Sequence, residues 1–214
     1  MTPKPSFDPT TQRWFLDELI FNSSTIEDIA IAVSQTSNPI GSYYLCHVRA
    51  FSNDLPDCGG QDCLPDYPRA GYDQNIFIID VNLFNTITWN FVTAAAYVLP
   101  KSKLIAGASF TYFRLTFPGD FVVQPSITAP GEPFDTTANG TEYLMEARNI
   151  FDGTHNVRVW AISNTNNIAS NPESLLGFDV DVVGKPYGPT VPSTQPQRCR
   201  SLLQIAGRHL GSVS

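Results

Sequence analysis

The sequence NIFIIDVNLFN, residues 75–85, is a strongly apolar block rich in residues that favour strands. Related blocks occupy residues 13–22 (RWFLDELIFN) and 141–152 (TEYLMEARNIFD). Each block contains an aromatic residue, then an acid two or three positions later, then a phenylalanine. The leading aromatics, Phe15, Phe77 and Tyr143, lie 62 and 66 positions apart, and we expect them at equivalent places in three modules. Self-similarity at this spacing predicts repeated β-sheet units.

Two further apolar segments follow each block, and we expect all of them to be strands. The first segments are residues 28–34, 91–99 and 156–163, and the second are residues 42–50, 108–117 and 175–183. In the last of these, Phe178, Val180 and Val182 alternate with Asp179 and Asp181, which predicts a strand with one apolar face. Residues 122–128 are a candidate fourth strand ahead of the third block.

The predicted fold is all-β. The 17 prolines and 14 glycines are spread between short apolar runs, as in chains of many strands and turns. Three similar units of sequential antiparallel strands favour propeller blades over a β-sandwich. Because propellers close with ~4–8 blades, about three blades predict a partial β-propeller or an open arc, either a fragment or part of an assembly. We place it at residues 1–186, with units starting near 13, 75 and 141, followed by a Pro-rich linker and disordered tail at 187–214.

Several short motifs occur in a distinctive order: Ile31–Ser34, Asn38-Pro39, Gly41–Tyr44, Asp66–Pro68, Gly71 with Asp73, and Ile76–Ile78. In this order they resemble the motifs of a group of secreted bacterial β-propeller-like proteins, which are largely uncharacterised. The resemblance covers roughly residues 7 to 190. It implies a propeller fold and export, and it brings no catalytic residues.

Charge and composition restrict the class of partner. The net charge is −7, and the four lysines are scattered, whereas nucleic-acid surfaces need clustered basic residues. No apolar run approaches the ~20 residues of a membrane span. With 15% charged residues and a texture rich in polar strand and turn residues, the chain suits an extracellular or cell-surface location, although it shows no signal peptide. Protein or glycan ligands fit this composition, and association through the open blade edges near Trp14 and Phe178 is a further expectation.

Cys58 and Cys63 flank a short loop, Gly59–Asp62. A disulfide between them would stiffen a surface loop in an oxidising compartment. A zinc clip is the alternative, but zinc requires four ligands and two more are not close in sequence. We therefore predict a disulfide and no metal at this loop.

Acidic residues are the main candidates for chemistry. Asp17, Asp80 and Glu146 hold corresponding places in the three blocks, and near a propeller axis they could meet at the central channel. There they could act as paired carboxylates on a glycan or bind Ca²⁺ through oxygen. The alternative is a structural role in the repeat. Tyr67 and Asp73 belong to a predicted loop from Asp66 to Asp73 that could bind a sugar or Ca²⁺, or form only an Asx-turn.

Three functions fit the sequence. The first is a noncatalytic extracellular β-propeller module that binds a protein or a glycan, with no cofactor apart from the Ca²⁺ option. The second is a glycoside hydrolase or lyase with acids at the central channel. The third is a structural surface or adhesin segment. We expect no catalytic residues under the first hypothesis, because the chain lacks a nucleophile elbow, a phosphate loop and a His-Glu-x-x-His motif.

Overall fold

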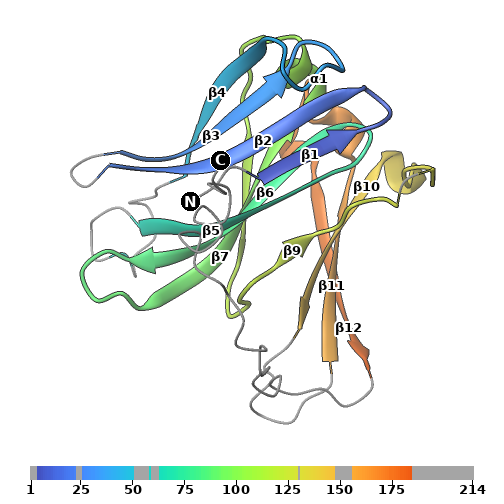
Figure 1. Ribbon diagram of the computed structural model, residues 1–214. Helices are drawn as coiled ribbons and strands as arrows, with labels where there is room; N and C mark the ends of the chain where they lie inside the picture. The colour runs from blue at the N-terminus through green and yellow to red at the C-terminus, as the bar shows by residue number, and fades with distance from the viewer. Residues whose placement is uncertain are drawn as a thin grey trace, which may run out of the picture.

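The computed structural model describes residues 4–22, 26–50, 58, 63–129, 131–147 and 156–184. These residues form three four-stranded antiparallel sheets, and none of the sheets closes on itself (Figure 1). Within every sheet the strands follow one another in sequence order. The all-β prediction with three units is therefore confirmed. The predicted linker and tail, residues 187–214, lie outside the described residues.

The blocks found in the sequence form the second strand of each sheet. The first sheet contains β1 (Lys4–Asp8), β2 (Arg13–Asn22), β3 (Ile26–Ser34) and β4 (Tyr43–Arg49). The second contains β5 (Cys63–Tyr72), β6 (Ile76–Asn85), β7 (Phe91–Pro100) and β8 (Phe113–Phe117). The third contains β9 (Gln124–Pro125), β10 (Thr141–Ala147), β11 (Asn156–Ser163) and β12 (Leu176–Val183).

The second sheet lies between the other two and is buried on both faces. Phe77 and Ile79 of β6 pack with Phe15 and Ile31 of the first sheet, in one apolar cluster. Ile78, on the opposite face of β6, joins a second cluster with residues of the third sheet, including Leu144 and Ile162. Double burial explains why the first four residues of β6 are all apolar, and why almost every position of this strand is buried, instead of apolar and polar residues alternating.

A short helix, α1 (Lys101–Ile105), follows β7 directly. The chain then runs without strand pairing until β8 begins at Phe113, so the strand predicted over residues 108–117 is too long at its start. Three short 3₁₀ turns occur in the third unit, at Thr137–Asn139, Thr165–Asn167 and Pro172–Ser174.

The segment predicted as a loop from Asp66 to Asp73 belongs to strand β5 up to Tyr72. Its pairing with β6 shifts between Asp66 and Arg69, which marks a bulge at Tyr67 and Pro68. Tyr67 has a φ of 57°, in the left-handed region. The bulge lets β5 contain a proline, which cannot donate a hydrogen bond to the sheet.

Candidate functional site

Two of the three repeated acids, Asp80 and Glu146, lie together between the second and third sheets. Asp80 is fully buried and its Oδ1 lies 2.6 Å from Nη2 of Arg69, its cross-strand partner on β5. Burial raises the pKa of Asp80 to about 8; Arg69 opposes this shift and the negative charge of Glu146 adds to it. The backbone N–H of Phe121 donates to Oε1 of Glu146 at 2.9 Å. Both carboxyl groups are therefore held inside the sheet interface.

Asp17 lies elsewhere, on the face of the first sheet that is turned to the second. Its neighbours along β2 on this face are the buried Phe15 and Leu19. Burial raises the pKa of Asp17 to about 6, against the opposing positive charge of Lys4. Oδ2 of Asp17 is buried and has no hydrogen-bond partner among the described residues. The structure thus brings Asp80 and Glu146 together and leaves Asp17 across the second sheet from them.

Tyr67 lies at the bulge, exposed between two cations. Nζ of Lys4 is 4.7 Å from the ring centre, and the guanidinium carbon of Arg69 is 5.0 Å from it. Lys4 also donates to the carbonyl oxygen of Pro68 at 2.8 Å, which ties the first strand of the first sheet to the bulge. Tyr67 therefore stands between the Lys4 charge that acts on Asp17 and the Arg69 charge that acts on Asp80.

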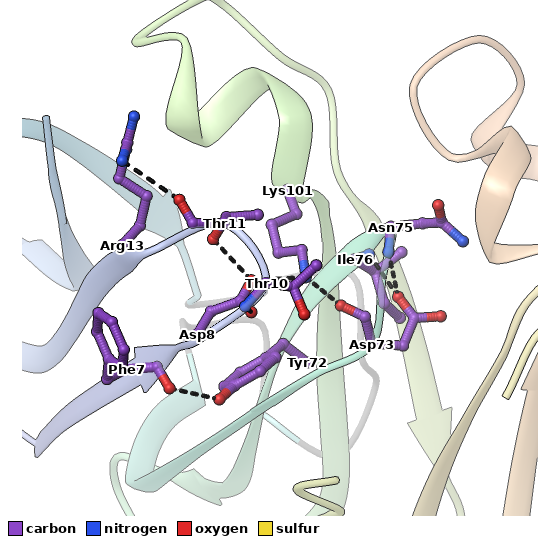
Figure 2. A network of polar contacts seen from close by, with 10 residues as sticks. All are labelled: Phe7, Asp8, Thr10, Thr11, Arg13, Tyr72, Asp73, Asn75, Ile76 and Lys101. Atoms are coloured by element: carbon purple, nitrogen blue, oxygen red, sulfur yellow. Dashed lines mark hydrogen bonds and ion pairs between the residues drawn. The ribbon is translucent and has the colours of Figure 1, made fainter. Parts of the chain in front are cut away.

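Asp73 belongs to a separate polar network at the other end of β5 (Figure 2). Its Oδ1 accepts hydrogen bonds from the backbone N–H groups of Asn75 and Ile76, at 2.6 and 2.7 Å. This is the geometry of an Asx-turn, the structural alternative for this residue. Lys101, which is 1% exposed, donates to the Asp73 carbonyl oxygen.

Lys101 also joins the first sheet to the second. Its Nζ lies 2.9 Å from Oδ2 of Asp8, at the end of β1. Burial would raise the pKa of Asp8, but the hydrogen bond and charge of Lys101, together with hydrogen bonds from Thr11 and Thr10, hold the pKa below its usual value. The hydroxyl of Tyr72 donates to the carbonyl oxygen of Phe7 at 2.8 Å in the same region.

The third sheet enters this network through residues that the sequence did not single out. The hydroxyl of Thr165, fully buried, donates to Oδ2 of Asp73 at 2.5 Å. Glu142 is 3% exposed and accepts a hydrogen bond from Ser126 Oγ at 3.2 Å. Burial raises the pKa of Glu142 to about 8, and the negative charge of Asp73 adds to the rise. These polar contacts thus join all three units of the chain, and we interpret them as structural.

The outer face of the third sheet, turned away from the second sheet, is apolar and exposed. Cross-strand rows run Tyr143–Ala161–Phe178, Met145–Val159–Val180 and Ala147–Val157–Val182. Phe178 and Val180 are 59% and 57% exposed, and Met145 is 50% exposed. None of the three rows contains a charged residue, because Asp179 and Asp181 point to the other face, where both lie near Arg158. The alternation predicted for β12 is confirmed.

The predicted cysteine pair is present at disulfide distance. Cys58 and Cys63 have Cα atoms 5.3 Å apart, within the range of disulfides, and both residues are fully buried. They belong to the apolar cluster between the first and second sheets. Cys46, on β4, is partly buried, and burial raises the pKa of its thiol to about 11.

Within the described part of the chain, no helix has the length and apolar character to span a bilayer. The same residues contain no group of three or more His, Cys, Asp or Glu side chains placed to hold a metal ion. Comparison with family models, curated proteins and solved structures found nothing that matches. Function is therefore inferred from the geometry of this chain.

Proposed function

We propose that the chain is a noncatalytic extracellular module whose three sheets are blades of a β-propeller-like structure, and that it binds a protein through the outer face of the third sheet. The observation that carries this proposal is the exposure of the three apolar rows. Where two sheets face each other, their apolar side chains are buried in the clusters between them. The outer face of the third sheet has no such cover, and an exposed apolar patch of this kind marks an interaction site.

A protein surface suits this face better than a glycan does. Sugars need hydrogen-bonding groups beside an aromatic platform, but the rows from Met145 to Val180 and from Ala147 to Val182 present only hydrocarbon and thioether groups. The apolar face of a sheet from another protein would cover these rows, as β5–β8 cover Leu144 and Ile162 on the opposite side of the third sheet. In the absence of another partner, a second copy of the chain would supply such a face.

The extracellular assignment is supported by the Cys58–Cys63 pair, since disulfides persist in oxidising compartments. The glycoside-active alternative rests on Asp80 and Glu146. We favour the binding function because Asp80 is engaged by Arg69 and both carboxyl groups are buried, whereas glycosidase carboxylates must reach a sugar.

The test compares the wild-type chain with Val180→Lys and with the matched variant Asp179→Lys, one position away on the opposite face. Sedimentation over a range of concentrations should show association of the wild type and of Asp179→Lys, and a monomer for Val180→Lys. Association unchanged by Val180→Lys would overturn the outer face as the binding surface. A glycan array, read with and without Ca²⁺, tests the alternative: glycan binding lost in Tyr67→Ala would move the function to the bulge.

A further inference from the structure

Lys101 and Asp8 form a buried ion pair between two different sheets (Figure 2). Nζ of Lys101 lies 2.9 Å from Oδ2 of Asp8, and the two side chains are 2% and 0% exposed. Asp8 is the last residue of β1 in the first sheet, whereas Lys101 begins α1, directly after β7 of the second sheet. A bond between these side chains would therefore join the first sheet to the second.

The amine of Lys101 is confined from several sides. Nζ also donates to the carbonyl oxygen of Asp73, and the ring centres of Phe134 and Tyr72 lie 4.9 and 5.2 Å from it. Lys4 and Lys103, in contrast, are exposed. An amine held in one place beside a carboxyl group, away from water, meets the proximity condition for a reaction between the two groups.

The carboxyl group of Asp8 is held by two further donors. The backbone N–H of Thr10 donates to Oδ1 at 2.9 Å, and the hydroxyl of Thr11 donates to Oδ2 at 2.8 Å. When an amine adds to a carboxyl carbon, negative charge develops on the oxygen that remains, and a fixed N–H donor stabilises that charge. The Thr10 N–H is placed for this role at Oδ1, and the Thr11 hydroxyl can assist the departure of Oδ2.

We propose that Lys101 and Asp8 condense to an isopeptide amide, which links the first and second sheets covalently. One proton passes from Nζ to Oδ2 within the ion pair, which leaves a neutral amine and a carboxylic acid. Nζ then bonds to Cγ of Asp8, and Oδ1 takes up the negative charge. Nζ gives a second proton to Oδ2, the Cγ–Oδ2 bond breaks, and Oδ2 leaves as water while the carbonyl at Oδ1 re-forms. The reaction consumes no other reactant.

Burial favours the amide over the ion pair. Removing two charges from water costs free energy that their mutual attraction offsets only in part, and condensation replaces both charges with one neutral group. The polar atoms of the amide keep partners, because its N–H can donate to the Asp73 carbonyl oxygen and its Oδ1 can still accept from Thr10. The water that is released returns to the solvent.

The second buried ion pair of the described residues, Arg69 with Asp80, lacks this chemistry. Nη2 of Arg69 lies 2.6 Å from Oδ1 of Asp80, and both side chains are buried. A guanidinium group keeps its proton in proteins, so it offers no neutral nitrogen for attack. A lysine amine can lose its proton when it is buried. The proposal is therefore specific to Lys101 and Asp8.

The cross-link would matter most for strand β1. This strand has five residues, pairs with β2 and forms the edge of the first sheet. Short edge elements open more easily than the core of a domain. An amide from Asp8 to Lys101 would hold the end of β1 against α1 even when the strand opens. This link is independent of the outer face of the third sheet.

The test measures the mass of the full chain after folding, reduction of its disulfide and unfolding. We expect the wild type to be lighter by one water than its sequence requires. A tryptic digest should contain residues 1–13 joined to residues 70–103, because trypsin cuts neither at an acylated Lys101 nor between Lys4 and Pro5. On a denaturing gel the linked chain should run faster than an unlinked one, since it contains a closed loop.

Lys101→Arg keeps the positive charge and cannot condense, so it should have its full mass and release residues 1–13. Lys103→Arg, at an exposed lysine of the same helix, is the matched control and should stay linked. Asp8→Asn should lose ammonia in place of water and reach the same final mass as the linked wild type, because both reactions give the same amide. Circular dichroism establishes that the variants are folded.

Three results would overturn the proposal. The first is a folded wild-type chain that keeps its full mass and releases residues 1–13 and 70–101 as separate peptides, an outcome that needs no variant. The second is loss of water with residues 1–13 still free, which places the loss at another site such as the Asp152-Gly153 sequence. Asp8 itself cannot close a ring onto the next backbone nitrogen, because Pro9 has no N–H. The third is equal linking in a chain kept unfolded in urea, which would show that the folded geometry is not the cause.

Discussion

Phe15 and Phe77 stack on each other between the first and second sheets, with ring centres 4.8 Å apart and planes 17° apart. Phe15 therefore faces the sheet that follows it in the chain, whereas Phe77 faces the sheet that precedes it. Tyr143 lies on the outer face of the third sheet, 36% exposed. If a rotation superposed each sheet on the next, a residue that faces the following sheet would be superposed on a residue that also faces the following sheet. Phe15 and Phe77 face in opposite directions, so the three aromatics are not at equivalent positions, contrary to the prediction.

The stack should couple the two phenylalanines energetically. We expect Phe15→Ala and Phe77→Ala each to lower the free energy of unfolding by about 3–5 kcal/mol. In a double-mutant cycle measured by urea unfolding, the coupling should be about 0.5–1.5 kcal/mol. Phe7→Ala, in the more exposed pair with Trp14, is the control and should cost less. Strict additivity of the two core variants would contradict a stabilising stack.

The Arg69–Asp80 pair should respond unequally to loss of either partner. At pH 9, above the Asp80 pKa of about 8, Asp80→Asn leaves a buried guanidinium that cannot lose its proton, and we expect a loss of about 3–5 kcal/mol in unfolding free energy. Arg69→Met leaves a carboxyl that can take up a proton, so the loss should be smaller. The double variant should recover part of the Asp80→Asn loss. Equal losses in the two single variants would show that Asp80 stays ionised without Arg69.

Glu142 should make stability depend on pH. Its pKa is about 8 in the folded chain, against an ordinary value of 4.5, so the folded state binds more protons between these values. The Glu142 contribution to stability is therefore complete below about pH 4.5 and is lost as the pH rises to about 8, by up to about 1.4 kcal/mol for each pH unit. Urea unfolding of Glu142→Gln should show a weaker decline over this interval.

Glu132→Gln, at an exposed acid of the same unit, is the control for Glu142→Gln and should keep the wild-type decline. If Glu142→Gln also follows the wild-type curve, the pH dependence belongs to other groups. Asp17 and Asp80, with pKa values of about 6 and about 8, are those groups.

Two glycines with similar backbone angles should differ sharply in their tolerance of alanine. Gly140 and Gly131 have φ values of +91° and +89°, so alanine is strained at both. A Cβ at Gly140 would overlap Thr165 Oγ1 and lie 2.7 Å from Nδ2 of Asn75, whereas a Cβ at Gly131 meets nothing within 4 Å. We expect Gly140→Ala to cost about 2–4 kcal/mol and Gly131→Ala about 1 kcal/mol, measured by thermal unfolding. Equal costs would show that the side chains of Thr165 and Asn75 can move to accommodate a Cβ at position 140 at little energetic cost.

The Cys58–Cys63 bridge closes a loop with a sequence separation of 5. A disulfide across so short a loop stabilises by about 2 kcal/mol in the chain-entropy model. Cys58→Ala with Cys63→Ala should lower the unfolding free energy by at least that amount, and Cys46→Ser should leave the linked peptide intact. Mass spectrometry of a non-reduced digest reports the linkage directly. Free thiols at both positions, in protein oxidised during folding, would rule out the bridge.

The sequence identified the strands that carry a strong local pattern. The runs at residues 156–163 and 175–183 were predicted within a residue of β11 and β12, because apolar and β-branched residues recur there with the period of a strand. Strand β5 was missed, since Pro65 and Pro68 argue locally against pairing. Pro65 pairs with Leu83 at the edge of the sheet, and the bulge that accommodates Pro68 is a property of the sheet.

The sequence by itself determined the class of fold, the three units and the cysteine pair, because side-chain periodicity and short spacings are properties of adjacent residues. The tertiary structure decided which face each acid occupies and what it meets. A change of one residue in register moves a side chain to the opposite face of a sheet. A repeat spacing near sixty residues therefore does not determine on which face of its sheet each acid lies. Asp80 therefore lies near Glu146 while Asp17 does not. Lys101 and Thr165 both donate to Asp73, and the charge of Asp73 acts on the buried Glu142, contacts that no local sequence pattern predicts.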